Sequence, residues 1–248
     1  ELGDGHVNIL MNPKHITRDN NCGATTITHI KDKNHDLVVL KKLTDSTLEE
    51  VGFKFHPTST KLLTLATSVR FGYLRIDAMT MSRRKLRSTL KASMKMFVDK
   101  EVVILDIRFN GGGDDKISFD IAGRFTDHKM VGHYKRTRKK GTKEYSPLRR
   151  YDIHPKGKER YTGPTVLLTS NYSASAADVF AMIMKELPHV TLIGNHTEGI
   201  FSDMQSIKMP NGWVVTLSHQ QYFSASMINY EGQGIAPEIL VKNFRDDS

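Results

Sequence analysis

Residues 102–113 read VVILDIRFNGGG, a short apolar run followed by three successive glycines. The run Val102–Asp106 predicts a buried strand. Glycines directly after it allow the backbone to turn sharply and to approach a ligand closely. Ile117, Ile121 and Phe125 then recur at helical spacing. This unit of strand, glycine turn and helix is typical of an α/β layered domain.

The same alternation of β-rich runs and helical periodicity extends along the chain from residue 69. Further strands are predicted at 69–76, 165–169 and 191–193, and helices at 82–99 and 174–187. Asn211-Gly212 lies between two β-rich runs, 205–209 and 213–218, and predicts a β-hairpin. We therefore expect an α/β (α+β) fold, with a layered core of mixed β-sheet flanked by helices.

The first 68 residues predict a different kind of structure. Residues 37–43 and 51–55 look like strands, and polar turns separate them. We expect a small N-terminal β-rich lobe over residues 1–68, and a core domain over residues 69–248.

Composition excludes several classes of protein. The chain has 248 residues, of which 38% are hydrophobic and 25% charged, so neither a disordered nor a collagen-like chain is indicated. The apolar runs are all too short for a membrane-spanning helix. The single cysteine, Cys22, cannot form an internal disulfide and lacks neighbours at ligand spacing, so we expect neither a metal nor a cofactor. The chain begins without Met or an apolar leader, which predicts a mature or truncated product.

The net charge of +9 is concentrated in residues 129–160. This segment holds twelve Lys and Arg residues against three acidic ones, so it accounts for the whole excess. A solvated loop is one interpretation. Binding of nucleic acid, an acidic surface or a peptide carboxylate is the other. The segment has few aromatic residues for base stacking, which argues against nucleic acid.

Two serines, Ser173 and Ser175, fall at the start of the predicted helix 174–187. Unpaired backbone N–H groups and the positive end of the helix dipole favour a developing oxyanion there, so either serine could serve as a nucleophile. The alternative is an N-cap, because Asp178 follows Ser175 by three residues. The glycines 111–113 are a second candidate site. They lack the ending of a phosphate loop, and the acidic residues that follow would repel phosphate.

Three segments carry a recognisable pattern: FGYLRI at residues 71–76, VILDIRFNGGG at 103–113 and LLTSNYSASAAD at 167–178. They resemble the core of the tail-specific (C-terminal processing) and tricorn-type serine peptidases. Further matches occur in the same order, at residues 194–199, 209–213 and 230–238. The resemblance covers roughly residues 69–243, with an outpost at 2–6. It implies a peptidase fold and acyl transfer from a serine.

The resemblance selects Ser175 as the nucleophile. The processing branch implies a lysine base at position 200, where this chain has Ile200, so a Ser–Lys dyad is excluded at that site. The tricorn branch implies instead His6 as general base and Glu231 as the carboxylate that orients it, a constellation that suits triad chemistry. Gly5 replaces the serine that precedes this histidine in the family. Other histidines compete for the role, namely His154, His196 and His219.

The resemblance also suggests which groups stabilise the oxyanion and which recognise the substrate. We expect the oxyanion hole to use the backbone N–H of Ala176 and one from Gly111 or Gly112. No PDZ module is expected over residues 7–68, so substrate recognition would fall to the basic segment, which we expect to attract acidic peptides or peptide C-termini. The residues concerned are Arg136, Arg138, Lys139 and Lys140.

Several alternatives remain open. A catalytically silent relative would bind a peptide or a hydrophobic ligand, and a polyanion-binding protein would use the basic segment. Asp106 and Arg108 are expected to pair inside the core. An extracytoplasmic location is suggested by envelope-processing members of the family, and association into a homo-oligomer is compatible with the sequence.

Overall fold

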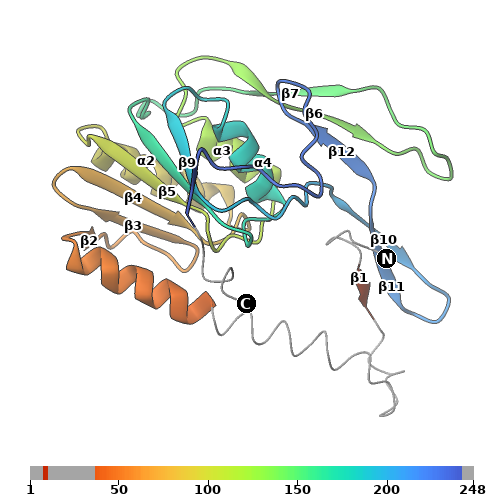
Figure 1. The fold of residues 1–248 in the computed structure, drawn as a ribbon, viewed down its shortest axis with the longest axis horizontal. Coiled ribbons are helices and arrows are strands. Elements are labelled where there is room, and N and C mark those ends of the chain that lie inside the picture. Colours follow the sequence, from red (N-terminus) through yellow and green to blue (C-terminus); the bar gives the residue numbers. More distant parts are fainter. Residues whose placement is uncertain (1–7, 11–36, 242–248) are drawn as a thin grey trace, which may run out of the picture. The chain divides into compact units, whose positions relative to one another are not determined.

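A computed structural model describes residues 8–10 and 37–241. The chain divides into two compact units, one of residues 1–53 and 204–218, the other of residues 54–203 and 219–248. The larger unit contains a seven-stranded sheet with strand order β13-β9-β8-β5-β4-β3-β2 (Figure 1). Its strands are β2 (Lys54–Phe55), β3 (Leu63–Thr67), β4 (Phe71–Ile76), β5 (Val102–Asp106), β8 (Thr165–Thr169), β9 (Val190–Gly194) and β13 (Ile239–Leu240).

The sheet is mixed, as the sequence predicts. Strands β4, β5, β8, β9 and β13 run parallel to one another, and β2 and β3 join the edge in antiparallel pairs. Three helices complete the core: α2 (Arg83–Phe97), α3 (Asp115–Ala122) and α4 (Ala176–Met184). Together these elements confirm the predicted fold class.

Helix α2 shows how the sequence specifies this packing. The Ser82 hydroxyl accepts the N–H of Lys85 and caps the helix. Leu86, Leu90, Met94 and Phe97 form its buried face. A Cβ at Gly72 of β4 would lie 2.4 Å from the Phe97 ring, so only glycine lets the helix pack this closely on the strand.

The basic segment forms part of a second, three-stranded sheet. Strands β6 (Met130–Thr137) and β7 (Arg149–Ile153) pair as an antiparallel hairpin, and β12 (Gln220–Phe223) joins β6 (Figure 1). The interpretation of residues 129–160 as a solvated loop is wrong for these strands. The Arg136 guanidinium lies 4.8 Å from the centre of the Tyr145 ring and the Lys135 ammonium 4.8 Å from that of Tyr222. Aromatic rings thus lie against the charged heads of these basic side chains.

The smaller unit holds the predicted hairpin of residues 205–218. Strands β10 (Met204–Lys208) and β11 (Val214–Ser218) pair antiparallel, and β1 (Asn8–Leu10) joins β11. The turn uses Gly212 at φ +83°, and the Asn211 side chain accepts the N–H of Trp213.

Residues 37–50 form a helix, so the predicted strand at 37–43 is wrong. Val38 and Val39 suggested a strand, yet both are half exposed. The half-buried positions recur at spacings of three and four, as in Leu37, Leu40 and Thr44, which fits a helical period rather than alternation.

The core sheet also begins earlier than the expected boundary at residue 68. Strand β3 pairs with β4 along its whole length, and β2 pairs with β3. Residues 54–67 therefore extend the core sheet, and of the predicted strand at 51–55 only Lys54–Phe55 is extended. Within the described residues, no helix has the length and apolar character needed to cross a membrane.

Candidate active site

Ser175 occupies a strained turn between β8 and α4. Its backbone has φ 57° and ψ −119°, and Ser175 and Met227 are the two non-glycine residues at positive φ in the described part of the chain. An ordinary N-cap has an extended backbone, so capping alone does not require this conformation. Strain of this kind is concentrated at functional sites, and a nucleophilic serine at a sharp strand-to-helix turn is one example.

Ser173 has a different environment. Its side chain is fully buried, and its hydroxyl donates to the carbonyl of Ile107 at 2.8 Å and accepts the N–H of Ser170 at 3.1 Å. These contacts join the turn to the end of β5. Of the two serines that the sequence left open, Ser173 therefore has a structural role, and Ser175, which is partly exposed, is the candidate nucleophile.

The glycine loop packs directly on Ser175. A Cβ built at Gly112 would lie 2.6 Å from Ser175 Cβ and 2.7 Å from the carbonyl oxygen of Ala174. Gly112 also has φ +101°, a conformation that favours glycine. Asn110 holds the loop in place, because its side chain accepts the N–H of Gly112 at 2.8 Å and its carbonyl accepts the N–H of Ala174 at 3.0 Å.

Two backbone N–H groups near Ser175 have no acceptor among the described residues. One belongs to Ala176, the first residue of α4, and the other to Gly111. The N–H of Gly112 is already donated to Asn110. Of the two glycines expected as oxyanion donors, Gly111 is therefore the one whose donor is available.

Asp178 holds the Ser175 turn in place through hydrogen bonds to its carboxylate. Its buried carboxylate accepts the N–H groups of Ser175 at 2.8 Å, Gly199 at 3.0 Å and Ile200 at 3.0 Å. Burial raises the pKa of Asp178 to about 6, although the hydrogen bonds to its charged form oppose the rise. Sequence reasoning treated this residue only as a helix cap. In the structure it also ties a distant segment to the serine turn.

That distant segment connects Ser175 with Glu231. Glu231 Oε2 accepts the N–H of Phe201 at 3.2 Å, and the N–H of Gly232 donates to the carbonyl of Gly199 at 2.8 Å. Since Asp178 holds residues 199 and 200 and Glu231 holds residue 201, one short segment links both acids. His6 lies outside the described residues.

The three histidines that compete with His6 for the role of general base lie in different parts of the structure. His154 lines a pocket beside α3, and His196 is exposed. The Nδ1 of His219 lies 2.9 Å from the carbonyl oxygen of Asp203, and its backbone N–H donates to the Ser202 hydroxyl.

Comparison with known proteins identifies the family of this chain. Residues 70–241 match the profile of peptidase family S41. The chain belongs to this family. It is 25% identical over 175 residues to the chloroplastic carboxyl-terminal-processing peptidase 1 of Arabidopsis thaliana, a match that covers 69% of this chain and 33% of the relative. It is 28% identical over 144 residues to the tricorn protease of Thermoplasma volcanium, covering 56% of this chain and 12% of that protein.

Solved structures show the same fold. A Parabacteroides merdae protein assigned as a peptidase superposes with a TM-score of 0.69 at 25% identity, covering 79% of this chain and 61% of the other. The S41 chain described here spans about a third of the length of its first curated relative. The family resemblance stated from the motifs is confirmed.

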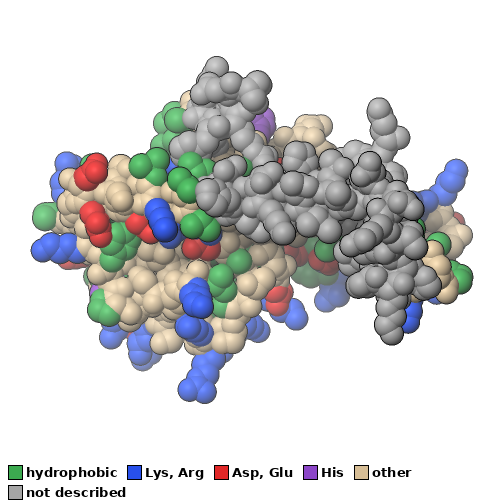
Figure 2. All heavy atoms as spheres, turned by 90° about the horizontal axis from the view of Figure 1, so that it is seen from below, with side chains coloured by type: hydrophobic (Ala, Val, Ile, Leu, Met, Phe, Trp, Pro, Cys, Tyr) green, Lys and Arg blue, Asp and Glu red, His purple; other side chains and the backbone are tan. Residues whose placement is uncertain are grey.

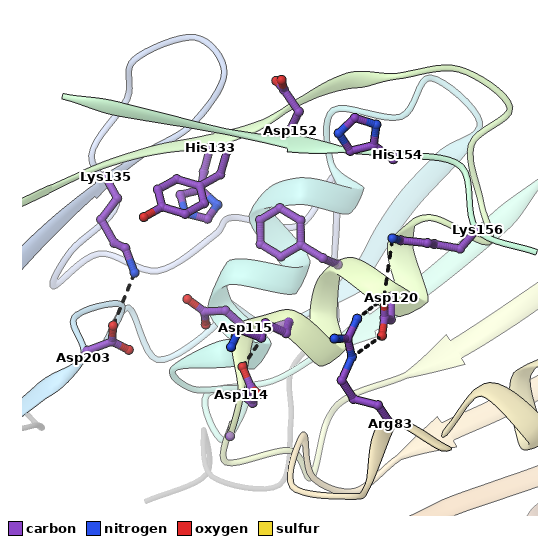
Figure 3. Close-up of a pocket in the computed structure, with 14 residues that line it drawn as sticks. Arg83, Asp114, Asp115, Asp120, His133, Lys135, Asp152, His154, Lys156 and Asp203 are labelled. Atoms are coloured by element: carbon purple, nitrogen blue, oxygen red, sulfur yellow. Dashed lines mark hydrogen bonds and ion pairs between the residues drawn. The ribbon is translucent and has the colours of Figure 1, made fainter. Parts of the chain in front are cut away.

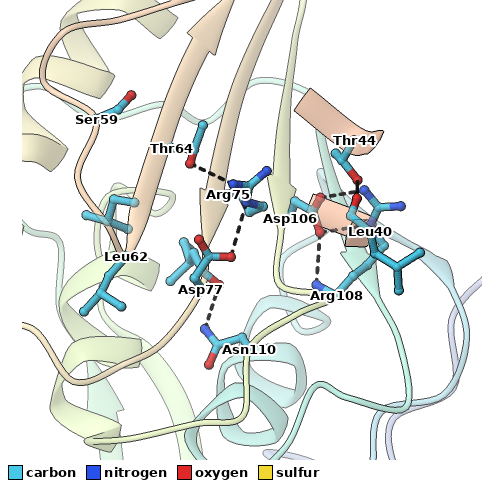
Figure 4. A network of polar contacts seen from close by, with 12 residues as sticks. Leu40, Thr44, Ser59, Leu62, Thr64, Arg75, Asp77, Asp106, Arg108 and Asn110 are labelled. Carbon is cyan, nitrogen blue, oxygen red and sulfur yellow. Dashed lines mark hydrogen bonds and ion pairs between the residues drawn. The ribbon is translucent and has the colours of Figure 1, made fainter. Parts of the chain in front are cut away.

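A buried ionic network supports the end of β5 in this S41 fold (Figure 4). The Arg108 guanidinium donates to both oxygens of Asp106, at 2.7 and 3.0 Å, which confirms the predicted pair. The Tyr73 hydroxyl also donates to Asp106, at 2.8 Å. A second buried pair, Arg75 and Asp77, lies on and beside β4, with 3.2 Å between Nε and Oδ1. These contacts fix the strand from which the glycine loop departs.

The four basic residues expected to bind substrate lie at the end of β6 and in the hairpin turn. Arg136 Nε donates to Gln221, Arg138 Nε to the carbonyl of Thr142, and Lys139 pairs with Glu144 at 2.9 Å. Figure 2 shows one face of the molecule, on which Lys and Arg side chains are scattered among acidic and hydrophobic ones rather than gathered into one patch. Among the described residues, no cluster of His, Cys, Asp and Glu could hold a metal ion.

Proposed function

We propose that this S41 chain is a serine peptidase that cleaves peptide bonds through an acyl-enzyme on Ser175. The observation that carries the proposal is the strained backbone of Ser175, at the start of α4 and packed against Gly112. A helix cap needs no such strain, whereas a nucleophile must present its hydroxyl beside oxyanion donors.

In the proposed reaction His6 removes the proton from Ser175 Oγ as the oxygen attacks the substrate carbonyl. The resulting oxyanion accepts the N–H groups of Ala176 and Gly111, each typically worth about 3 kcal/mol in the transition state. His6 then gives the proton to the leaving amine, and an ester to Ser175 remains. Water, deprotonated by the same imidazole, hydrolyses the ester and releases the serine.

Glu231 is proposed to orient His6 and to stabilise its charged form. Its contact with Phe201 supports the assignment, because the segment 199–201 that it holds is the one that Asp178 ties to Ser175. The position at which the processing branch has its lysine is Ile200. A histidine base is therefore the alternative that the family offers.

The substrate class is a peptide or protein. The basic residues of the hairpin are proposed to draw acidic segments or C-termini toward the site by long-range attraction. Neutralising Arg136, Arg138, Lys139 and Lys140 together should raise KM for an acidic peptide at low salt. An unchanged KM would reject this role. An extracytoplasmic location, which the family resemblance suggests, is part of the proposal.

Digestion of casein tests the proposed function. The chain is compared with its Ser175→Ala, His6→Ala and Glu231→Gln variants, and with Ser226→Ala, which changes an exposed serine, as the control. We expect activity to be lost in the first two, reduced in the third and retained in the control. Equal digestion by the chain and its Ser175→Ala variant would refute the proposal. Peptide binding without any digestion would favour a silent relative instead.

A further inference from the structure

A pocket of about 630 Å³ lies beside α3, and strands β6 and β7 contribute to its walls (Figure 3). Its lining includes Asp115 and Phe119 from α3, His133 from β6 and Tyr151 from β7. Gly113 also lines it, and the neighbouring Gly112 packs on Ser175. The pocket therefore begins at the loop that we propose to form the oxyanion hole.

His133 is the unusual residue of this pocket. It is 1% exposed, and neither ring nitrogen has a hydrogen-bond partner among the residues that the structure describes. Its ring stacks on Tyr151 at 4.8 Å and on Tyr222 at 5.1 Å, and lies 5.4 Å from the Phe119 ring. Figure 3 shows it pointing from its strand toward the helix that carries Asp115.

The His133 ring is held in its neutral form. Burial, reinforced by Lys135, lowers the pKa of His133 to about 3. A neutral imidazole offers one N–H donor and one acceptor, and leaving both unmet in a buried place is costly. The ring thus provides a donor and an acceptor for a molecule that enters the pocket.

Some charged side chains around the pocket form ion pairs, and others form hydrogen bonds alone. Arg83 pairs with Asp120 at 2.8 Å, Lys135 with Asp203 at 3.3 Å, and Lys129 with Asp152 at 2.9 Å. Within the described residues, the two carboxylates nearest the glycine loop, at positions 114 and 115, form no ion pair; their hydrogen bonds come from a backbone N–H and from the Tyr222 hydroxyl.

Asp115 keeps its charge at neutral pH. Burial raises the pKa of this carboxyl to about 6, and the hydrogen bond from Tyr222 limits the rise. The pocket therefore combines aromatic walls with a partly buried carboxylate that forms no ion pair with any described residue.

We infer that this pocket binds a lysine or arginine side chain of the peptide substrate, beside the scissile bond. The inference deepens the proposed function and rests on it. The aliphatic stem would lie along Phe119 and Tyr151, and the cationic head would donate to Asp115 and to the acceptor nitrogen of His133. A side chain without N–H donors would leave those groups unpaired, and an acidic one would be repelled.

The test uses two fluorogenic peptides that differ at one residue, lysine or norleucine, with that residue moved through the positions flanking the cleaved bond. Norleucine keeps the stem and removes the charge. We expect kcat/KM to favour lysine at one position, and Asp115→Asn to lower the lysine-to-norleucine ratio about tenfold or more. His133→Phe should lower the same ratio. Asp99→Asn, an exposed acid at the end of α2, is the matched control and should not.

Binding separates this inference from the proposed function. The Ser175→Ala variant is titrated with dye-labelled forms of both peptides, and fluorescence anisotropy gives Kd. Tighter binding of the lysine peptide, weakened by Asp115→Asn, supports the pocket even where no peptide is cleaved. Cleavage of both peptides with equal kcat/KM, or a ratio that Asp115→Asn leaves unchanged, would overturn the inference while leaving the serine mechanism intact.

Discussion

Replacement of Gly112 by alanine should disable the site with a loss of stability that can be estimated. The new methyl group would lie 2.6 Å from Ser175 Cβ, 2.7 Å from the carbonyl oxygen of Ala174 and 3.1 Å from the nitrogen of Ala176. All three contacts are closer than van der Waals packing allows. Two of the three atoms belong to backbone, so the loop and the serine turn must move apart.

The cost has two parts. An alanine at φ +101° is strained by about 1–2 kcal/mol, and overpacking of a rigid contact adds about 1–3 kcal/mol. With about 2–4 °C per kcal/mol for a chain of this size, Tm should fall by about 10 °C. Displacement of the Ser175 hydroxyl by about 1 Å should also reduce kcat/KM by about a hundredfold.

Gly141→Ala is the matched control. Gly141 has φ +74°, but a Cβ added there would have no atom within 4 Å, so this variant carries the backbone strain without the clash. Thermal unfolding followed by circular dichroism and casein digestion are measured for both variants. A Gly112→Ala protein with a Tm no lower than that of Gly141→Ala, and with full activity, would refute the packing argument.

Three further results are expected. Asp106→Asn should lower the free energy of unfolding by about 3–5 kcal/mol, because it leaves Arg108 without its buried partner; Glu101→Gln, which breaks an exposed pair, should barely change Tm. The folded state raises the pKa of Asp115 to about 6, so ionisation of this carboxyl between about pH 4 and 6 destabilises the folded state. The Tm of the wild type should therefore fall relative to that of Asp115→Asn as pH rises through this range. A difference in Tm between the two proteins that does not change with pH would contradict the raised pKa. His133→Phe should raise or preserve Tm, because it removes unpaired buried nitrogens; a fall of several degrees would indicate a structural role for the imidazole.

Hydrophobic periodicity made the core predictable. Leu86, Leu90 and Met94 lie on one face of α2, and the strand, glycine turn and helix around residues 102–125 form as expected. It is misleading at 37–43, where adjacent valines favour a strand but lie on the surface of a helix. The strands of the basic segment are harder to predict, because β6 pairs not only with β7 of the same segment but also with β12, which is distant in sequence.

The candidate site was predictable in part. The helix start at Ser175 was visible in the sequence, but the choice between cap and nucleophile depends on a backbone conformation that only the fold provides. Asp178 looked like a cap because its bonds to residues 199 and 200 come from a remote segment. The unmet nitrogens of His133 had no sequence signal, since burial of a single histidine is decided by its tertiary neighbours.

Labelling with a fluorophosphonate probe tests the central claim most directly. The probe phosphonylates a serine whose hydroxyl is activated and faces oxyanion donors, and fluoride leaves. Peptide mass spectrometry of the folded, labelled chain should find the adduct on Ser175, and it should disappear in the His6→Ala variant. An unmodified Ser175 in folded protein, or equal labelling after removal of His6, would contradict the proposed mechanism.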